Sequence, residues 1–106
     1  MKATIWHNPR CSKSREALAL LEEAGADVTI IRYLDMPPTR DELVRLYARA
    51  GLAPRDAMRK DAPRASTDDE ALDIMAADPA TIERPLVETD KGVVLARPPE
   101  RIRSIL

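Results

Sequence analysis

The segment from His7 to Arg15 contains the only cysteine of the 106-residue chain, Cys11. Its Asn-Pro pair favours a turn, and apolar spacing of the helical type follows, so the thiol is predicted at the entrance of a helix. Unpaired N–H groups at a helix N-terminus and the cationic side chains of Arg10, Lys13 and Arg15 stabilise a thiolate. We therefore expect the pKa of Cys11 to lie below that of a free thiol, which would make Cys11 a nucleophile at neutral pH.

The same loop could bind a tetrahedral oxyanion, because successive backbone N–H groups ahead of a helix form an anion-binding concavity. Ser12 and Ser14 can add hydroxyl donors. A lone cysteine in an arbitrary protein is more often a buried core residue. The polar and basic surroundings of Cys11 favour the reactive interpretation.

The residues auxiliary to the Cys11 loop are His7, Asn8, Ser14 and Arg15. His7 is the only histidine, and it could carry a proton or bond to the loop; a structural role is an equally good interpretation. Asn8 is better explained as a residue that shapes the turn through bonds to the backbone.

Three arginines, Arg59, Arg84 and Arg97, lie beside predicted helix ends or strand starts. Taken singly, each is interpreted as a solvated surface charge. Arg84 and Arg97 directly precede prolines at the two limits of a predicted hairpin, where guanidinium groups can be aimed at one point. The bond between Arg84 and Pro85 is also a candidate cis peptide.

The first third of the chain predicts a strand-helix-strand unit that positions Cys11. A strand is predicted at residues 2–6, a helix at 14–24 ending at Gly25, and a second strand at 28–34. The second strand is β-branched and apolar, so we expect it to be covered on both faces. So short a connection implies a right-handed parallel unit.

The remainder of the chain predicts helices, then a hairpin and a last helix. Thr39 with Glu42 and Thr67 with Glu70 form capping boxes that begin two helices, and Pro54 opens a short turn between them. This order predicts an α/β fold, in which a four-stranded mixed sheet has flanking helices and a helical insertion, about residues 39–82, after the second strand. The hairpin is predicted from strands at 86–88 and 93–96 with a turn at 89–92, and the last helix follows Pro98-Pro99.

Composition limits the classes of function. Seventeen Lys and Arg against eighteen Asp and Glu give a net charge of −1, so the overall field favours neither nucleic acid nor an acidic partner. The length predicts a single domain, 1–106, and the lack of a signal peptide or membrane-spanning run predicts a cytoplasmic location. With no Cys-x-x-Cys, metal-ligand spacing, Gly-rich phosphate loop or aromatic platform, the sequence supports no metal, nucleotide or nucleic-acid site.

The segment around Cys11 and the segments that carry Arg59, Arg84 and Arg97, together with two short motifs between them, resemble the arsenate reductase (ArsC) branch of the ArsC/Spx family over nearly the whole chain. The resemblance implies a thioredoxin-like fold with Cys11 as the catalytic cysteine and with Arg59, Arg84 and Arg97 as oxyanion-binding residues. It also implies that Pro85 is the cis proline of that fold and that His7 lies beside the catalytic loop. The motifs are His7 to Arg15, Tyr33-Leu34, Pro37-Pro38, Arg59-Lys60, Glu83 to Val87 and Arg97 to Glu100.

The resemblance further implies reduction of arsenate to arsenite, in which the Cys11 thiolate forms an adduct with arsenic that glutathione then attacks. Since no second cysteine can resolve the adduct, the electrons must come from outside the chain. The resemblance points to glutathione as co-substrate and glutaredoxin as partner, with no tightly bound cofactor.

Three alternatives remain open at this point. The first is a general glutathione-dependent thiol reductase on the same scaffold. The second is an Spx-like transcriptional regulator that binds RNA polymerase, although such proteins typically use a Cys-x-x-Cys switch and this chain has Ser14 in the second cysteine position. The third is a relic of the fold without turnover.

One segment departs from the family pattern. Between Arg59-Lys60 and Thr67 the family usually carries a longer stretch with a Tyr-x-x-Leu pattern, and here only residues 61–66 remain. This shortening is expected to loosen the insertion that carries Arg59 and to change the cover over the site, while it leaves the Cys11 loop intact.

Overall fold

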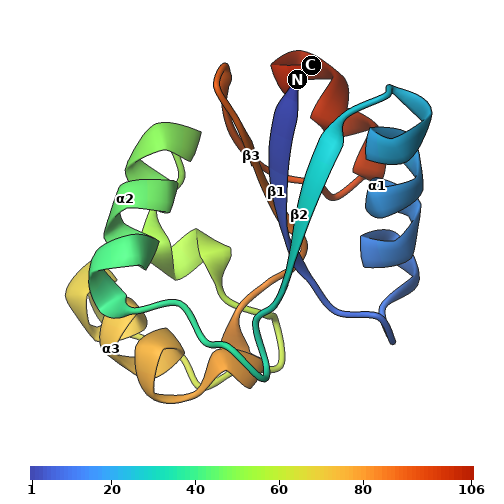
Figure 1. Ribbon diagram of the computed structural model, residues 1–106. Coiled ribbons are helices and arrows are strands. Elements are labelled where there is room, and N and C mark those ends of the chain that lie inside the picture. The colour runs from blue at the N-terminus through green and yellow to red at the C-terminus, as the bar shows by residue number, and fades with distance from the viewer.

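The computed structural model describes residues 1–106 as one four-stranded sheet with helices on both faces (Figure 1). The strands are β1 (Lys2–His7), β2 (Asp27–Arg32), β3 (Leu86–Thr89) and β4 (Gly92–Leu95); the α-helices are α1 (Ser12–Glu23), α2 (Arg40–Ala50) and α3 (Asp68–Ala77); and the 3-10 helices are η1 (Pro54–Ala57), η2 (Pro79–Thr81) and η3 (Pro99–Ile105). The sheet order is β2-β1-β3-β4, with β1 parallel to β2 and antiparallel to β3. The predicted mixed sheet, flanking helices and insertion after the second strand are confirmed.

Local capping signals determine where the insertion helices begin. The Thr39 and Thr67 side chains accept hydrogen bonds of 3.1 Å from the N–H groups of Glu42 and Glu70, at the starts of α2 and α3. Gly51 ends α2 at a φ of 63°, a left-handed conformation that costs glycine little. The helices predicted from the two capping boxes are thus confirmed.

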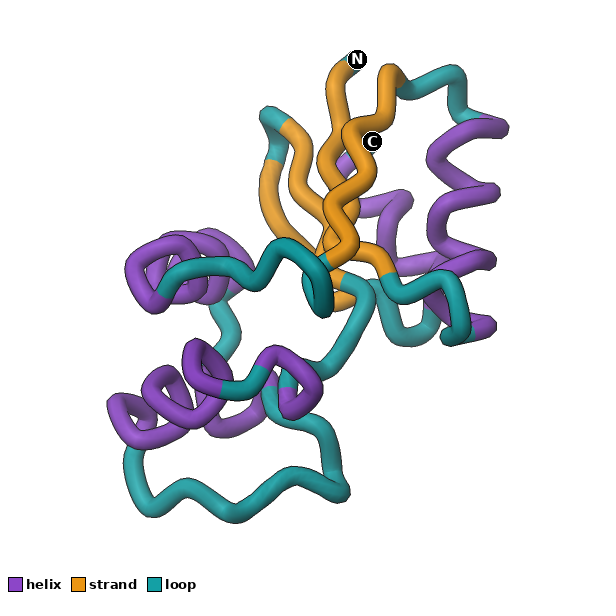
Figure 2. The backbone as a smooth tube through the Cα atoms, turned by 60° about the horizontal axis from the view of Figure 1, so that its bottom comes forward, coloured by secondary structure: helices purple, strands orange, loops and turns teal.

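Each face of the sheet carries its own hydrophobic cluster, because side chains alternate along β1. Ile5 belongs to the cluster shared with α1 and η3, where Ile102 and Ile105 are buried, whereas Trp6 belongs to the cluster shared with the insertion. Figures 1 and 2 show α1 on one side of the sheet and the insertion helices α2 and α3 on the other. The insertion is therefore packed against the sheet through a core that includes Trp6, Tyr33, Leu43, Leu46, Tyr47 and Met75.

The burial predicted for the second strand is wrong. β2 forms one edge of the sheet, and Ile30 in its middle is 49% exposed. The β-branched residues identify a strand, but the place of that strand in the sheet is decided by pairing with distant segments. The strand also ends earlier than predicted, so that Tyr33 and Leu34 lie in a turn.

The carboxylate of Glu88 on β3 ties the sheet to α2. It accepts hydrogen bonds of 2.6 and 3.0 Å from the Arg45 guanidinium and a further one from Arg49. The Arg45 hydrogen bonds, opposed by partial burial and reinforced by Arg49, hold the pKa of Glu88 below its usual value. Because the folded-state pKa is lowered, this stabilisation is present above the unfolded pKa of about 4.3 and is lost as pH falls through the folded value.

Glu88→Gln is expected to lower the free energy of unfolding by about 1 to 2 kcal/mol at neutral pH, since the group that accepts the arginine hydrogen bonds loses its negative charge. The difference from the wild type should shrink well below about pH 4, where the wild-type carboxylate is itself protonated. Denaturant unfolding at both pH values checks this, with Glu23→Gln on the exposed end of α1 as the matched control. An equal difference at both pH values would contradict it.

Candidate active site

Cys11 occupies the N-cap position of α1 and is 8% exposed. Its side chain makes no capping hydrogen bond of standard geometry, yet the helix N-terminus acts on the sulfur electrostatically. Burial raises the pKa of the Cys11 thiol, but the N–H groups of Ser14 and Lys13, the charge of Arg84 and a hydrogen bond from Arg97 together outweigh it. The pKa therefore lies below its ordinary value, which favours a thiolate.

The basic side chains of the loop turn to local partners. Lys13 pairs with Glu16 at 3.6 Å, and Arg15 donates to the carbonyl oxygen of Pro9 at 2.9 Å. Neither side chain forms a hydrogen bond with the Cys11 sulfur, so the stabilisation of the thiolate expected from these loop cations has no direct contact behind it. Two arginines far along the chain lower the pKa of Cys11: Arg84 through its charge, and Arg97 through a hydrogen bond to the sulfur.

The structure brings Arg59, Arg84 and Arg97 together around one pocket of about 320 Å³. Arg97 joins this pocket to the thiol, because its Nη1 lies 3.7 Å from the Cys11 sulfur. The same nitrogen donates to the carbonyl oxygen of Arg84 at 3.2 Å. The other residues that line the pocket are Lys60, Asp61 and Glu83.

Arg84 and Arg97 meet because they lie at the two ends of the β3-β4 hairpin. Leu86 pairs with Leu95 in the antiparallel register, so the segments just outside these residues run side by side. The Arg84–Pro85 peptide bond, singled out in the sequence, is cis in the structure, and so is Arg97–Pro98, which the sequence analysis did not single out.

Arg59 is held beside Arg84 by backbone pairing between two segments of the insertion. Residues 57–59 and 81–83 form a short antiparallel bridge with two hydrogen bonds of 2.9 Å. The Arg59 guanidinium donates to both oxygens of Asp61, at 3.0 and 3.4 Å. Arg59 therefore lines the pocket although the segment at residues 61–66 is short.

A buried network of hydrogen bonds holds the Cys11 loop in place. His7 Nδ1 and the Ser14 hydroxyl share a hydrogen bond of 2.6 Å, and the Ser14 oxygen accepts the Asn8 N–H at 3.0 Å. Burial, followed by the charges of Arg32 and Arg15, lowers the pKa of His7 and favours a neutral imidazole. These contacts orient Ser14, whose N–H in turn lowers the pKa of the catalytic candidate.

Comparison with known protein families decides the affiliation of this chain. The model of the ArsC family matches residues 6–105. The chain belongs to the ArsC family. A protein named arsenate reductase from Escherichia coli (strain K12) is 43% identical over 112 residues, which cover 97% of this chain and 79% of that protein. A protein of the same name from Rhizobium meliloti (strain 1021) is 42% identical over 115 residues, which cover 100% and 82%.

The solved structure of an arsenate reductase from Vibrio cholerae has the same fold as this ArsC-family chain. The TM-score is 0.92 at 40% sequence identity, and the match covers 100% of this chain and 98% of the other. The thioredoxin-like fold implied by the resemblance is thus confirmed.

Tyr33 is a residue of the ArsC-family site to which the sequence analysis gave no role. It is buried, and its hydroxyl accepts a hydrogen bond of 3.4 Å from Asn8 Nδ2. Burial is the main cause that raises the pKa of Tyr33, so the hydroxyl stays protonated at neutral pH. The predicted parallel pairing of the first two strands could have indicated this contact. Because His7 lies opposite Arg32 in that pairing, the residues that follow the two strands, Asn8 and Tyr33, lie at the same edge of the sheet.

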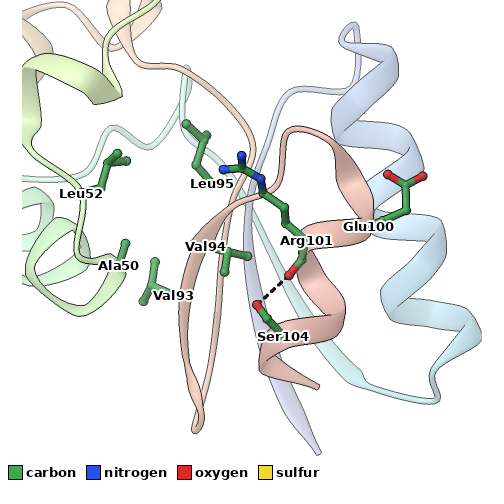
Figure 3. A pocket seen from close by; sticks show the side chains of 8 residues that line it. All are labelled: Ala50, Leu52, Val93, Val94, Leu95, Glu100, Arg101 and Ser104. Carbon is green, nitrogen blue, oxygen red and sulfur yellow. Dashed lines mark hydrogen bonds between the residues drawn. The ribbon is translucent and has the colours of Figure 1, made fainter.

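Away from the Cys11 site, the ArsC-family chain has an apolar hollow of about 270 Å³ between the end of α2, β4 and η3 (Figure 3). Most of its lining is aliphatic, and it shares no residue with the arginine pocket. The hollow is lined by Ala50, Leu52, Val93, Val94, Leu95, Glu100, Arg101 and Ser104.

None of the helices is both long and apolar enough to cross a membrane.

Proposed function

We propose that this ArsC-family protein reduces arsenate to arsenite, with Cys11 as the nucleophile. The observation that carries the proposal is the position of Arg97, which contacts the Cys11 sulfur and lines the same pocket as Arg59 and Arg84. An oxyanion held by these guanidinium groups lies within reach of the thiolate, so attack becomes effectively intramolecular. The names of the relatives support arsenate as that oxyanion.

The proposed reaction draws two electrons from thiols outside the chain. The Cys11 thiolate attacks arsenic, and one oxygen leaves as water after taking up a proton from the solvent. Glutathione then attacks arsenic, and a second oxygen leaves as water with the thiol proton, so that a second arsenic-sulfur bond forms. A glutaredoxin thiolate attacks the glutathione sulfur, and the mixed disulfide leaves as the arsenic-glutathione electron pair passes to arsenic. Hydrolysis of the remaining bond releases arsenite and the Cys11 thiolate. Glutathione is kept reduced in the cytoplasm, where we place the reaction.

A second basic hollow supports glutathione as the first reductant. It has a volume of about 590 Å³ and shares Arg59 and Lys60 with the oxyanion pocket. Arg64 lies in this hollow but not in the oxyanion pocket, and Lys60 and Arg64 form no ion pair with any acidic side chain. Glutathione carries two carboxylates, which these cations could hold while its thiol reaches the adduct.

Arg64→Ala is expected to raise the KM for glutathione about two- to fivefold, the size of a surface charge pair, and to leave the KM for arsenate unchanged. Initial rates of arsenite formation at varied glutathione and varied arsenate check this. Arg103→Ala, on the exposed side of η3, is the matched control. An Arg64→Ala variant with the wild-type KM for glutathione would remove this hollow from the reductant site.

Arsenite formation by the purified protein tests the proposed function. The rate is measured with arsenate, glutathione and glutaredoxin together, and again with each one omitted. We expect turnover only with the complete mixture. A folded protein that forms no arsenite in the complete mixture, yet reduces a mixed disulfide of glutathione, would instead be a general thiol reductase.

A further inference from the structure

Two carboxylates lie among the four cations of the oxyanion pocket, and they differ in whether an oxygen remains free to accept a further hydrogen bond. Asp61 uses both oxygens on the Arg59 guanidinium. Glu83 uses only Oε1, which accepts from the Arg84 guanidinium at 3.1 Å and from the Arg84 backbone N–H at 3.4 Å. Glu83 Oε2 accepts no hydrogen bond from the protein and is accessible to solvent, and Glu83 is one of the residues that line the pocket.

An ionised carboxylate oxygen can accept a hydrogen bond but cannot donate one. It therefore attracts a ligand oxygen that carries a proton and repels one that does not. Hydrogen arsenate and hydrogen phosphate retain a hydroxyl at neutral pH, whereas sulfate of the same charge and shape has none. Among the residues that line the pocket, the four cations outnumber the two carboxylates, so the pocket attracts anions.

We propose that Glu83 makes the pocket selective for a protonated tetrahedral oxyanion, arsenate or phosphate, over sulfate. Glu83 Oε2 accepts the ligand hydroxyl while Arg59, Arg84 and Arg97 bind the unprotonated oxygens. With sulfate, the same carboxylate faces an oxygen that has no proton, so an unpaired negative charge opposes binding. This inference rests on the proposed function for its substrate, and it assigns Glu83 as a specificity-determining residue.

The alternative role for Glu83 is to position Arg84 alone. In that case the carboxylate acts on every anion through Arg84, and its replacement changes the affinities for phosphate and sulfate by the same factor. Selectivity between the two anions therefore separates the roles, which a loss of activity cannot do.

The test measures dissociation constants for phosphate, arsenate and sulfate by calorimetry, with Cys11→Ser as the parent so that no chemistry follows binding. The parent is expected to prefer phosphate and arsenate to sulfate. Adding Glu83→Gln should reduce this preference about 10- to 100-fold, the size of one hydrogen bond to a charged group, because the amide N–H can donate to sulfate. Glu23→Gln on the same parent is the matched control and should leave the preference unchanged.

An unchanged ratio of the sulfate and phosphate constants in the Glu83→Gln variant overturns the proposal, as does a parent protein that prefers sulfate or binds none of the anions. The selectivity is measured without turnover, so the two hypotheses fail separately. Selective binding without arsenite formation by the wild type would refute the proposed function and leave the role of Glu83 standing. Arsenite formation by the wild type, together with an unchanged ratio of the sulfate and phosphate constants in the Glu83→Gln variant, would support the proposed function and refute the role of Glu83.

Discussion

Replacing Cys11 with serine is expected to abolish arsenite formation while the protein stays folded. The serine hydroxyl remains un-ionised at neutral pH, and it cannot form the sulfur-arsenic bond on which the electron transfer depends. We expect the turnover rate to fall by about three orders of magnitude or more, as for removal of a catalytic nucleophile. Serine is itself a favourable N-cap residue, so α1 should begin at the same position.

The measurement is the rate of arsenite formation in the complete glutathione and glutaredoxin mixture. Circular dichroism and thermal unfolding establish that the Cys11→Ser variant is folded. Arsenate binding provides a second readout, because the three arginines of the pocket are intact in the variant. Arsenite formation at a substantial fraction of the wild-type rate would remove Cys11 from the reaction.

Arg97→Ala is expected to impair the site in two ways, because Arg97 contacts both the thiol and the pocket. Loss of its charge-assisted hydrogen bond raises the pKa of Cys11, which lowers the thiolate fraction at neutral pH. Loss of one guanidinium also weakens oxyanion binding by about 1.5 to 3 kcal/mol, or about 10- to 100-fold. Arg84→Ala should weaken oxyanion binding by a similar factor.

Alkylation by iodoacetamide as a function of pH measures the thiol pKa, and calorimetry with phosphate measures anion affinity. The wild-type pKa should lie below the free-thiol value of about 8.5, and Arg97→Ala should move it upward, so that alkylation slows at neutral pH but not at high pH. Arg10→Ala is the matched control, since the Arg10 side chain is exposed and forms no hydrogen bond with the thiol. A wild-type pKa of Cys11 at or above the free-thiol value, or the same Cys11 pKa in the Arg97→Ala and Arg10→Ala variants, would contradict this account.

The position of Cys11 at a helix entrance and the starts of α2 and α3 were predictable from the sequence. Each depends on groups within three or four residues of one another, such as the Thr39 hydroxyl and the Glu42 N–H. The pattern of apolar residues and turn residues also predicted the hairpin of β3 and β4. Local hydrogen bonding and periodicity suffice for such features, because little of the remaining chain is needed to satisfy them.

Only the tertiary structure decided which charges act on the thiol. The nearest cations in the sequence, Lys13 and Arg15, turn to local partners, whereas Arg97 reaches the sulfur because hairpin pairing places it there. The exposed edge position of β2 and the unused oxygen of Glu83 depend on pairing and packing in the same way. A side chain of a few ångströms contacts whatever the fold brings beside it, so sheet register and hairpin pairing determine this pocket more than sequence spacing does.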